Sequence, residues 1–482
     1  MINKLKRLLK DSLIYSLGRI SGSIISIFLV PIYTRIFSPH DYGIIDLIAT
    51  VVAFLNLFLL LGIENGVARY YVDAKENKDK KLTASTGLFF ITAFSFVVIP
   101  ILILFSKKLS FLIFESRTYS LFLTVALSTI PFYILFYYFQ NMLKWRFQPT
   151  FFTITSVGLL LLQTSLTVYL VVSLKIGIIG IYIAQLIGLF VFSIIGFSLT
   201  KSSYSILFSF KRLRGLLSFG TPYLPLSISY YIMTYSDRYF LRYFHGLGEV
   251  GLYGIGYKVA SLITLLTVGF QSAWGPFVYS VYKDKDGRKI FSKVFDYFCI
   301  ISCFAVLILS IFSHEILKIF ATEKYFEAYK VIPFIAVSIV AYTLGPYFSI
   351  GIGISKRTIH KGWTGILAAL MNIGLNILFI PHYGMIGAAI ATILSFSILG
   401  VVQMLISQRF YPVGYNFKSN FIMYFIASLI IFIVYRFLPA KLTFTSIGLK
   451  FCLLMGFASV PFLLRLIGKK EIDYIKKMLV KT

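Results

Sequence analysis

Apolar stretches of roughly 18 to 25 residues recur along the whole chain, and they constrain its fold more than any other feature. A stretch of this length matches the hydrocarbon core of a bilayer, which an α-helix crosses in about 20 residues. Inside lipid the backbone polar groups have no water to bond, so a spanning segment must be a helix or belong to a closed barrel. Helical length and continuous apolarity predict an all-α integral membrane protein.

The composition excludes a soluble protein. Hydrophobic residues make up 58% of the chain and charged residues 13%, and the mean hydropathy is +0.85. An ordinary soluble domain is about 25% charged. A soluble chain this apolar would expose large sticky patches, which lipid tolerates and water does not.

About fourteen apolar stretches are long enough to cross a bilayer, so the sequence predicts about fourteen transmembrane helices. We expect the first stretch to be a helix and not a cleavable signal, because no small-residue cleavage site follows the basic start of the chain. The predicted spans are 12–35, 43–64, 83–106, 119–141, 150–173, 177–199, 215–240, 250–273, 294–313, 327–352, 363–380, 385–407, 420–438 and 445–467.

The formal net charge is +28, from 46 Lys and Arg against 18 Asp and Glu. The bases lie mainly in alternate short loops, such as 75–81, 211–214 and 283–293, and near both ends of the chain. The positive-inside rule therefore predicts that both termini are cytoplasmic. Anionic membrane lipids explain most of this charge better than nucleic acid does, and part of it is available for an anionic substrate.

The sequence repeats at an offset of 207 residues. Segment 35–43 (RIFSPHDYG) aligns with 242–251 (RYFHGLGEVG), 62–65 (GIEN) with 269–272 (GFQS), and 175–184 (KIGIIGIYIA) with 382–391 (HYGMIGAAIA). Six predicted spans separate equivalent points, so both copies have the same orientation and form a parallel repeat. The repeat predicts two six-helix lobes, 1–200 and 201–410, followed by two C-terminal helices and a basic tail in 411–482.

Several segments resemble the bacterial polysaccharide (O-antigen) flippases of the multidrug/oligosaccharidyl-lipid/polysaccharide exporter superfamily. They are 31–43 (PIYTRIFSPHDYG), 218–225 (SFGTPYLP), 236–240 (SDRYF), 250–253 (VGLY) and 376–389 (NILFIPHYGMIGAA). The resemblance implies two lobes around a central cavity in the cytoplasmic (inner) membrane of a bacterium. It implies a substrate, an oligosaccharide on an undecaprenyl pyrophosphate carrier, and leaves polysaccharide polymerase machinery as a candidate partner.

Arg19 and Lys258 are basic residues within predicted spans, where a charge is costly unless it faces protein or water. Arg19 shares its helix with several serines, which favours a surface that lines a cavity; snorkelling to the cytoplasm is the alternative. Lys258 lies about eight residues, or roughly 12 Å, into its span. It is expected to meet an anionic ligand in the cavity or to belong to a buried structural pair.

Three candidate gating residues lie in or just after the second span. Asp46 and Glu64 are 18 residues apart, which predicts one shared helix face. Asp46 is also placed to interact with the helix dipole in the first turn. Glu64 lies between Gly62 and Gly66, a spacing that permits close helix approach, and it can pair with a base such as Arg69 or rest at the interface.

Asp237 and Arg238 end the seventh span. Because adjacent residues on a helix do not face each other, we expect them to pair with other elements, as an outer gate or as a fixed contact between the lobes. Candidate hinges for alternating access, or static kinks, are the helix-breaking residues Pro222, Pro225, Gly275, Pro276, Gly345 and Pro346.

The sequence has no catalytic triad pattern, no metal-ligand spacing and no phosphate-binding glycine loop, so we expect no enzyme activity, metal or cofactor. Alternatives remain open. A drug/cation antiporter and a peptidoglycan-precursor flippase belong to the same superfamily. A membrane glycosyltransferase or polymerase is disfavoured by the repeat and by the short loops.

Overall fold

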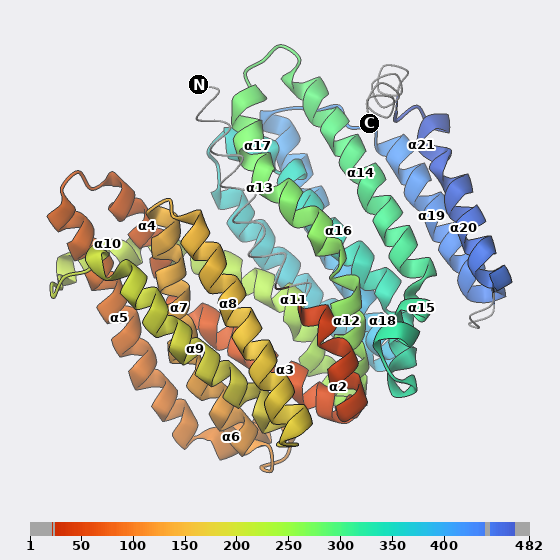
Figure 1. Ribbon diagram of the computed structural model, residues 1–482. Helices are drawn as coiled ribbons and strands as arrows, with labels where there is room; N and C mark the ends of the chain where they lie inside the picture. The colour runs from red at the N-terminus through yellow and green to blue at the C-terminus, as the bar shows by residue number, and fades with distance from the viewer. Residues whose placement is uncertain (1–21, 23–24, 439–443, 468–482) are drawn as a thin grey trace. The chain divides into compact units, whose positions relative to one another are not determined.

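The computed structural model describes residues 22, 25–438 and 444–467. Within these residues the chain is helical, with helices joined by short turns and with no strand (Figure 1). The predicted all-α fold is confirmed. The chain divides into two compact units: the described residues of 1–255 with 362–395, and 256–361 with the described residues of 396–482.

The first unit holds most of the helices of the N-terminal half. They are α2 (Val30–Ile36), α3 (Pro39–Leu60), α4 (Ile63–Asp73), α5 (Asn77–Leu104), α6 (Ser106–Phe114), α7 (Ser120–Trp145), α8 (Pro149–Val168), η1 (Tyr169–Ser173), α9 (Ile178–Thr200), η2 (Lys201–Ser203), α10 (Phe210–Gly220), η3 (Thr221–Tyr223) and α11 (Leu224–His245). Most of α12 (Leu247–Ala260) and the middle of α18 (Ile359–Phe410) also belong to it.

The second unit holds the remaining helices and the ends of α18. They are α13 (Ile263–Val281), α14 (Gly287–Ile311), α15 (Ser313–Phe320), η4 (Glu323–Lys330), α16 (Ile332–Phe348), α17 (Ile350–Ile354), α19 (Phe417–Phe437), α20 (Phe444–Ala458) and α21 (Val460–Leu463). The lobe division predicted at residues 200 and 410 rests on the sequence repeat and stays a prediction.

Ten helices in the described part of the chain are long and apolar enough to cross a membrane, and the bent pair of η4 and α16 makes up to eleven. Helix α18 is counted once, although its backbone leaves helical geometry at Gly384, between predicted spans 363–380 and 385–407. Most of predicted span 12–35 lies outside the described residues. Span 215–240 falls on α10, which is short, and on α11, which is polar. The count of fourteen stays a prediction.

The repeat seen in the sequence is reproduced in the backbone. Gly177 has φ 73° and ψ −146°, and Gly384, exactly one repeat later, has φ 52° and ψ −132°. Residues with a side chain rarely adopt this combination. Both copies of the repeat therefore break the chain at the same place and in nearly the same conformation, which supports a common structure for the two copies.

Gly43 and Gly251, the last residues of the aligned segments 35–43 and 242–251, also pack against each other; they lie 208 positions apart because the second segment is one residue longer. A Cβ atom on Gly43 of α3 would overlap the carbonyl oxygen of Leu247, and one on Gly251 of α12 would overlap that of Pro39. The contact is reciprocal, as expected for a two-fold relation between the copies. The absence of side chains at both positions lets α3 and α12 cross with their backbones in contact.

Local signals set the ends of α3. Ser38 and Asp41 form a capping box, in which each side chain accepts a hydrogen bond from the other residue's backbone N–H, and Pro39 occupies the first turn. The helix stops at Leu61 and Gly62, which have φ of 49° and 68°. Gly62 can adopt this left-handed conformation without strain, and its missing side chain lets Gly220 of α10 approach closely.

Candidate functional site

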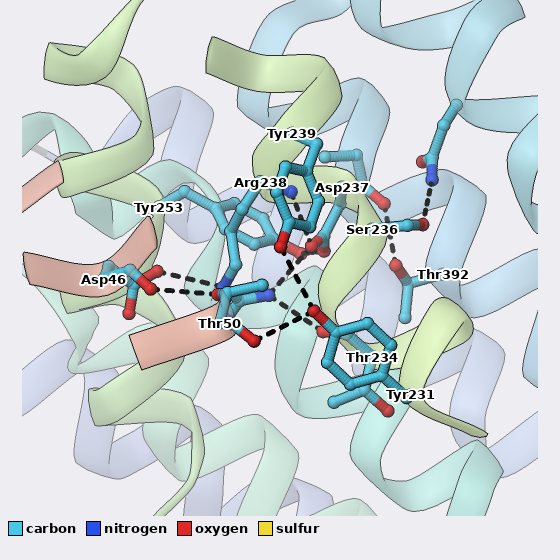
Figure 2. Close-up of polar contacts among 12 residues, drawn as sticks. Asp46, Thr50, Tyr231, Thr234, Ser236, Asp237, Arg238, Tyr239, Tyr253 and Thr392 are labelled. Carbon is cyan, nitrogen blue, oxygen red and sulfur yellow. Dashed lines mark hydrogen bonds and ion pairs between the residues drawn. The ribbon is translucent and has the colours of Figure 1, made fainter. Parts of the chain in front are cut away.

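Arg238 of α11 is the centre of a buried charged cluster (Figure 2). Its Nε lies 2.9 Å from Oδ2 of Asp46 on α3, and its Nη1 lies 2.8 Å from Oδ1 of Asp237. The same Nη1 donates to the carbonyl oxygen of Thr234 at 2.8 Å. The side chain of Arg238 is 3% exposed, and those of Asp46 and Asp237 are 18% and 2% exposed. The guanidinium thus joins two carboxylates from two helices away from solvent.

Tyrosines surround this cluster and fix its geometry. Tyr253 of α12 donates to Oδ2 of Asp237 at 2.6 Å, and its ring also lies against the Arg238 guanidinium. Tyr235 presents its ring to the guanidinium from another side, at 5.2 Å. The hydroxyl of Tyr231 donates to the carbonyl oxygen of Thr50 on α3 at 2.9 Å (Figure 2). Helices α3, α11 and α12 are therefore held together by polar contacts as well as by packing.

The predicted pairing of Asp237 and Arg238 with other elements is confirmed, since Arg238 reaches Asp46 of α3 and Asp237 accepts from Tyr253 of α12. Three further expectations about these residues are wrong. Asp237 and Arg238 also pair with each other, because the long arginine side chain folds back over its own helix. Asp46 does not lie in the first helical turn, since α3 begins at Pro39 and Asp41 takes that place. Asp46 and Glu64 do not share one helix, because the left-handed residues at 61 and 62 separate α3 from α4.

A chain of amides that the sequence predictions missed lies on the other side of α11. Ser236 donates to Asn372 Oδ1 at 3.1 Å, and Asn372 donates to Ser395 at 3.1 Å. Asn376 donates to both Ser236 and Asn372, each at 3.2 Å. The signal was present, because Asn372 and Asn376 stand one helical turn apart within an apolar stretch.

A cavity of about 660 Å³ lies within the first unit, between α3, the start of α4, α7, α8, α9, η3 and the start of α11. Along α3 its wall runs from Ile45 to Leu60, a length of roughly 22 Å at 1.5 Å per residue. The polar side chains on its described wall are Asn56, Glu64, Asn65, Thr129, Tyr133, Tyr137, Gln163, Tyr182, Gln185, Tyr223 and Ser227. Amides and tyrosines dominate this set.

Glu64 lies on the cavity wall and not in an ion pair with Arg69. One carboxylate oxygen, Oε1, accepts from Asn65 at 3.2 Å, whereas Oε2 is buried and has no hydrogen-bond partner among the described residues. Arg69 instead pairs with exposed Asp73, one turn along α4. The predicted close approach at Gly62 and Gly66 is confirmed, because a Cβ atom on Gly66 would overlap the backbone of Leu216 on α10.

The structure describes only one of the two basic residues predicted to bind substrate. Arg19 lies outside the described residues. Lys258 is half-buried near the end of α12, where its carbonyl oxygen accepts a hydrogen bond from Ser261 at 2.6 Å. Their role in binding stays a prediction.

The candidate hinge residues occur in different local structures. Pro222 lies in the 3₁₀ turn η3 that links α10 to α11, and Pro225 lies in the first turn of α11. Helix α13 is continuous through Gly275 and Pro276, so the sequence Gly-Pro does not end it. Gly345 and Pro346 lie in the last turn of α16, which ends at Phe348. Movement at any of these positions stays a prediction.

Other ion pairs were not predicted, and some of them join different helices or loops. Arg242, one turn after Arg238, pairs with Glu115 at 2.8 Å; the hydrogen bond and the positive charge of Arg242 lower the pKa of that exposed carboxyl. In the second unit Glu315 of α15 and Lys450 of α20 form a buried pair.

No group of three or more His, Cys, Asp or Glu side chains suited to a metal ion is found in the described part of the chain.

Comparison with known proteins gives a family. Residues 8–281, more than half of the chain, match the family described as polysaccharide biosynthesis protein. A protein of the Lsg locus of Haemophilus influenzae is 24% identical over 286 residues, which cover 58% of this chain and 68% of that protein. An uncharacterized membrane protein of Methanocaldococcus jannaschii is 28% identical over 210 residues, covering 41% of this chain and 40% of that protein.

Two solved structures show the fold. The lipid II flippase MurJ, in an inward closed conformation, superposes with a TM-score of 0.74 at 16% identity, covering 93% of this chain and 98% of MurJ. A multidrug resistance MATE family transporter of the MOP superfamily, outward-facing, gives 0.63 at 15% identity, covering 84% and 95%. With many apolar helices long enough to span a membrane, a MurJ- and MATE-like fold and a family match over residues 8–281, this chain is a multi-span membrane protein that belongs to the polysaccharide biosynthesis protein family.

Proposed function

We propose that this chain is a flippase that moves undecaprenyl-pyrophosphate-linked oligosaccharide units across the cytoplasmic membrane of a bacterium, for O-antigen- or capsule-type surface polysaccharide. The observation that carries the proposal is the polysaccharide biosynthesis family match on a chain whose fold resembles that of a lipid-linked substrate flippase. No covalent chemistry is part of it.

The physical problem is the passage of a pyrophosphate and several sugars through about 30 Å of hydrocarbon. In the proposed mechanism Arg19 and Lys258 neutralise the pyrophosphate, whose transfer from water is otherwise very costly. The undecaprenyl chain stays in lipid. The Asp46, Asp237 and Arg238 cluster acts as a gate, with Glu64 and Arg69 as further gating candidates, and the proline and glycine positions act as hinges during alternating access.

The proposed orientation places both termini in the cytoplasm, on the basis of the loop charges. Reporter fusions after Lys81, Lys289 and Lys361 are expected to report cytoplasm, and fusions near Arg117 and Lys324 are expected to report the outside. Alkaline phosphatase and green fluorescent protein, inserted at these positions of the chain, measure this. Opposite results at two or more sites contradict the orientation or the number of spans.

Deletion of the protein is expected to leave synthesis of the lipid-linked unit intact and to abolish surface polysaccharide, because a flippase changes where its substrate lies and not its covalent structure. The unit then accumulates on the carrier, facing the cytoplasm. Extraction of carrier lipids, with a membrane-impermeant probe of leaflet exposure, measures both effects. Normal surface glycan without build-up of carrier-linked sugar contradicts the proposal.

A peptidoglycan-precursor flippase is the second candidate, favoured by the likeness to the lipid II flippase MurJ over 93% of the chain. Deletion then causes lipid II to accumulate and cells to lyse. The same experiment recognises the other classes: a drug antiporter leaves the glycan unchanged and alters sensitivity to cationic compounds, a polymerase leaves exported single units, and a glycosyltransferase leaves truncated ones.

A further inference from the structure

The cavity of the first unit has hydrogen-bond acceptors without donors. Asn56 Oδ1 on α3 and Glu64 Oε2 on α4 are both buried, both belong to residues of its wall, and neither has a partner among the described residues. Leaving a buried acceptor unsatisfied is costly, more so when it carries charge. A ligand that fills this cavity therefore gains most by donating hydrogen bonds.

The charge on the cavity wall further restricts which part of the substrate can bind there. Glu64 is the one Asp, Glu, Lys or Arg among the described lining residues. A phosphate or a sugar carboxylate in the cavity would lie near the Glu64 carboxylate, and no described residue of the wall supplies a base to balance the two negative charges. Like charges at close range in a low-dielectric site repel strongly. The part of the wall formed by described residues thus disfavours the pyrophosphate and favours an uncharged part of the substrate.

The remaining polar residues suit hydroxyl groups and a ring. Gln163 and Gln185 both belong to the wall, and the Gln163 amide donates to the backbone carbonyl oxygen of Gln185 at 3.3 Å. The rings of Tyr133 and Tyr137 are stacked, with centroids 6.1 Å apart and planes 11° from parallel. The volume, about 660 Å³, is within the roughly 300–1,000 Å³ of small-molecule sites lined by aromatic side chains and a few placed polar groups.

We propose that this cavity is a subsite for an uncharged sugar of the transported glycan, with Glu64 and Asn56 accepting hydrogen bonds from sugar hydroxyls and Tyr133 packing against the ring. The inference rests on the proposed flippase function and deepens it. It assigns the neutral sugar to the first unit and leaves the pyrophosphate to the basic residues.

Protection of a cysteine in the full-length protein tests the subsite. Ser227 of the wall is changed to cysteine after Cys299, Cys303 and Cys452 are replaced by serine, and its labelling by a maleimide is timed. Methyl glucoside is expected to slow labelling, and methyl glucuronide, which differs by a carboxylate, is not. Carrier-linked glycan from the deletion strain is expected to protect at far lower concentration than undecaprenyl pyrophosphate without sugar. Thr118→Cys, at an exposed position off the wall, is the unprotected control.

Variants assign the protection to named residues. Glu64→Gln is expected to weaken protection by methyl glucoside about ten-fold or more, because a hydrogen bond to a charged acceptor is lost. Asp73→Asn, an equal charge change at an exposed position of the same helix, is the matched control and is expected to change nothing. Tyr133→Phe keeps the ring and the protection; Tyr133→Ala loses protection, with thermal unfolding measured to show that the variant is folded.

Several outcomes overturn the subsite. Equal protection by the neutral and the acidic sugar, or none by either sugar or by the carrier-linked glycan, removes it. Protection by sodium or by tetraphenylphosphonium, but not by sugar, shows a cation site instead. If the deletion strain accumulates carrier-linked glycan while protection is absent, the flippase proposal stands and the subsite falls. If no glycan accumulates, the flippase proposal falls, and sugar-specific protection would then identify a sugar-binding cavity with another use.

Discussion

Replacing Arg238 by alanine is expected to destabilise the purified protein by about 3–5 kcal/mol, since breaking a buried ion pair from one side leaves its partner charges buried and uncompensated. Here two carboxylates, those of Asp46 and Asp237, would be left without the guanidinium that joins them. Thermal unfolding in detergent, followed by the loss of the monodisperse peak in size-exclusion chromatography, measures the effect.

The chain provides a matched control for this variant. Arg242 lies one turn further along α11 and pairs with Glu115, whose side chain is 68% exposed. Exposed pairs of this kind contribute at most about 1 kcal/mol, so Arg242→Ala is expected to leave thermal unfolding nearly unchanged. Equal losses for the two variants would show that the buried cluster is not what stabilises the first unit.

A neutral variant separates a gate from a fixed contact. Combining Asp46→Asn, Asp237→Asn and Arg238→Met removes all three charges together, so most of the stability is expected to return. If the cluster is a gate, this variant is folded but exports glycan at an altered rate. If it is a fixed contact, stability and export recover together. Arg238→Lys is expected to be intermediate, because an ammonium group does not reproduce the guanidinium fork.

Arg19→Ala and Lys258→Ala are each expected to abolish surface polysaccharide while the protein remains in the membrane, because the proposed role of both bases is to neutralise the pyrophosphate. Arg19→Lys and Lys258→Arg keep the charge and are expected to retain part of the export. Surface glycan and the amount of protein in the membrane are measured together in a complemented deletion strain.

Lys289→Ala is the control for these variants, since Lys289 is 85% exposed and pairs with Asp286 near the start of α14. Full export by both alanine variants would show that neither base handles the substrate. Loss of the protein from the membrane would instead assign a structural role, such as a buried pair for Lys258.

The sequence predicted those structural features that depend on a local pattern of residues. Apolar stretches predicted the helices, and the repeat predicted that Gly177 and Gly384 occupy equivalent positions. Both positions have a backbone conformation that residues with a side chain rarely adopt, which explains why both are glycine. The sequence did not predict the pairing of Asp46 with Arg238. The two residues lie 192 positions apart, and their meeting depends on how α3 packs against α11.

The error at Glu64 has a different origin. A continuous apolar stretch hides the end of α3, since Leu61 and Gly62 change the direction of the chain without changing its hydrophobicity. The cavity could not be predicted either, because its wall is made of side chains from six α-helices and the turn η3, and no single segment shows how these elements pack.

The reciprocal crossing at Gly43 and Gly251 has the form expected if two half-length subunits of an ancestral homodimer became fused into one polypeptide. Three residues further along each helix the copies differ: Asp46 stands in one and Gly254 in the other, and the Asp46 carboxyl carbon lies 3.0 Å from where a Cβ atom of Gly254 would be. A dimer of identical subunits would have to place two carboxylates face to face at this point. In a fused chain the two positions are independent, and here a single acid beside the crossing, Asp46, pairs with Arg238, so the charged cluster does not follow the two-fold relation of the copies.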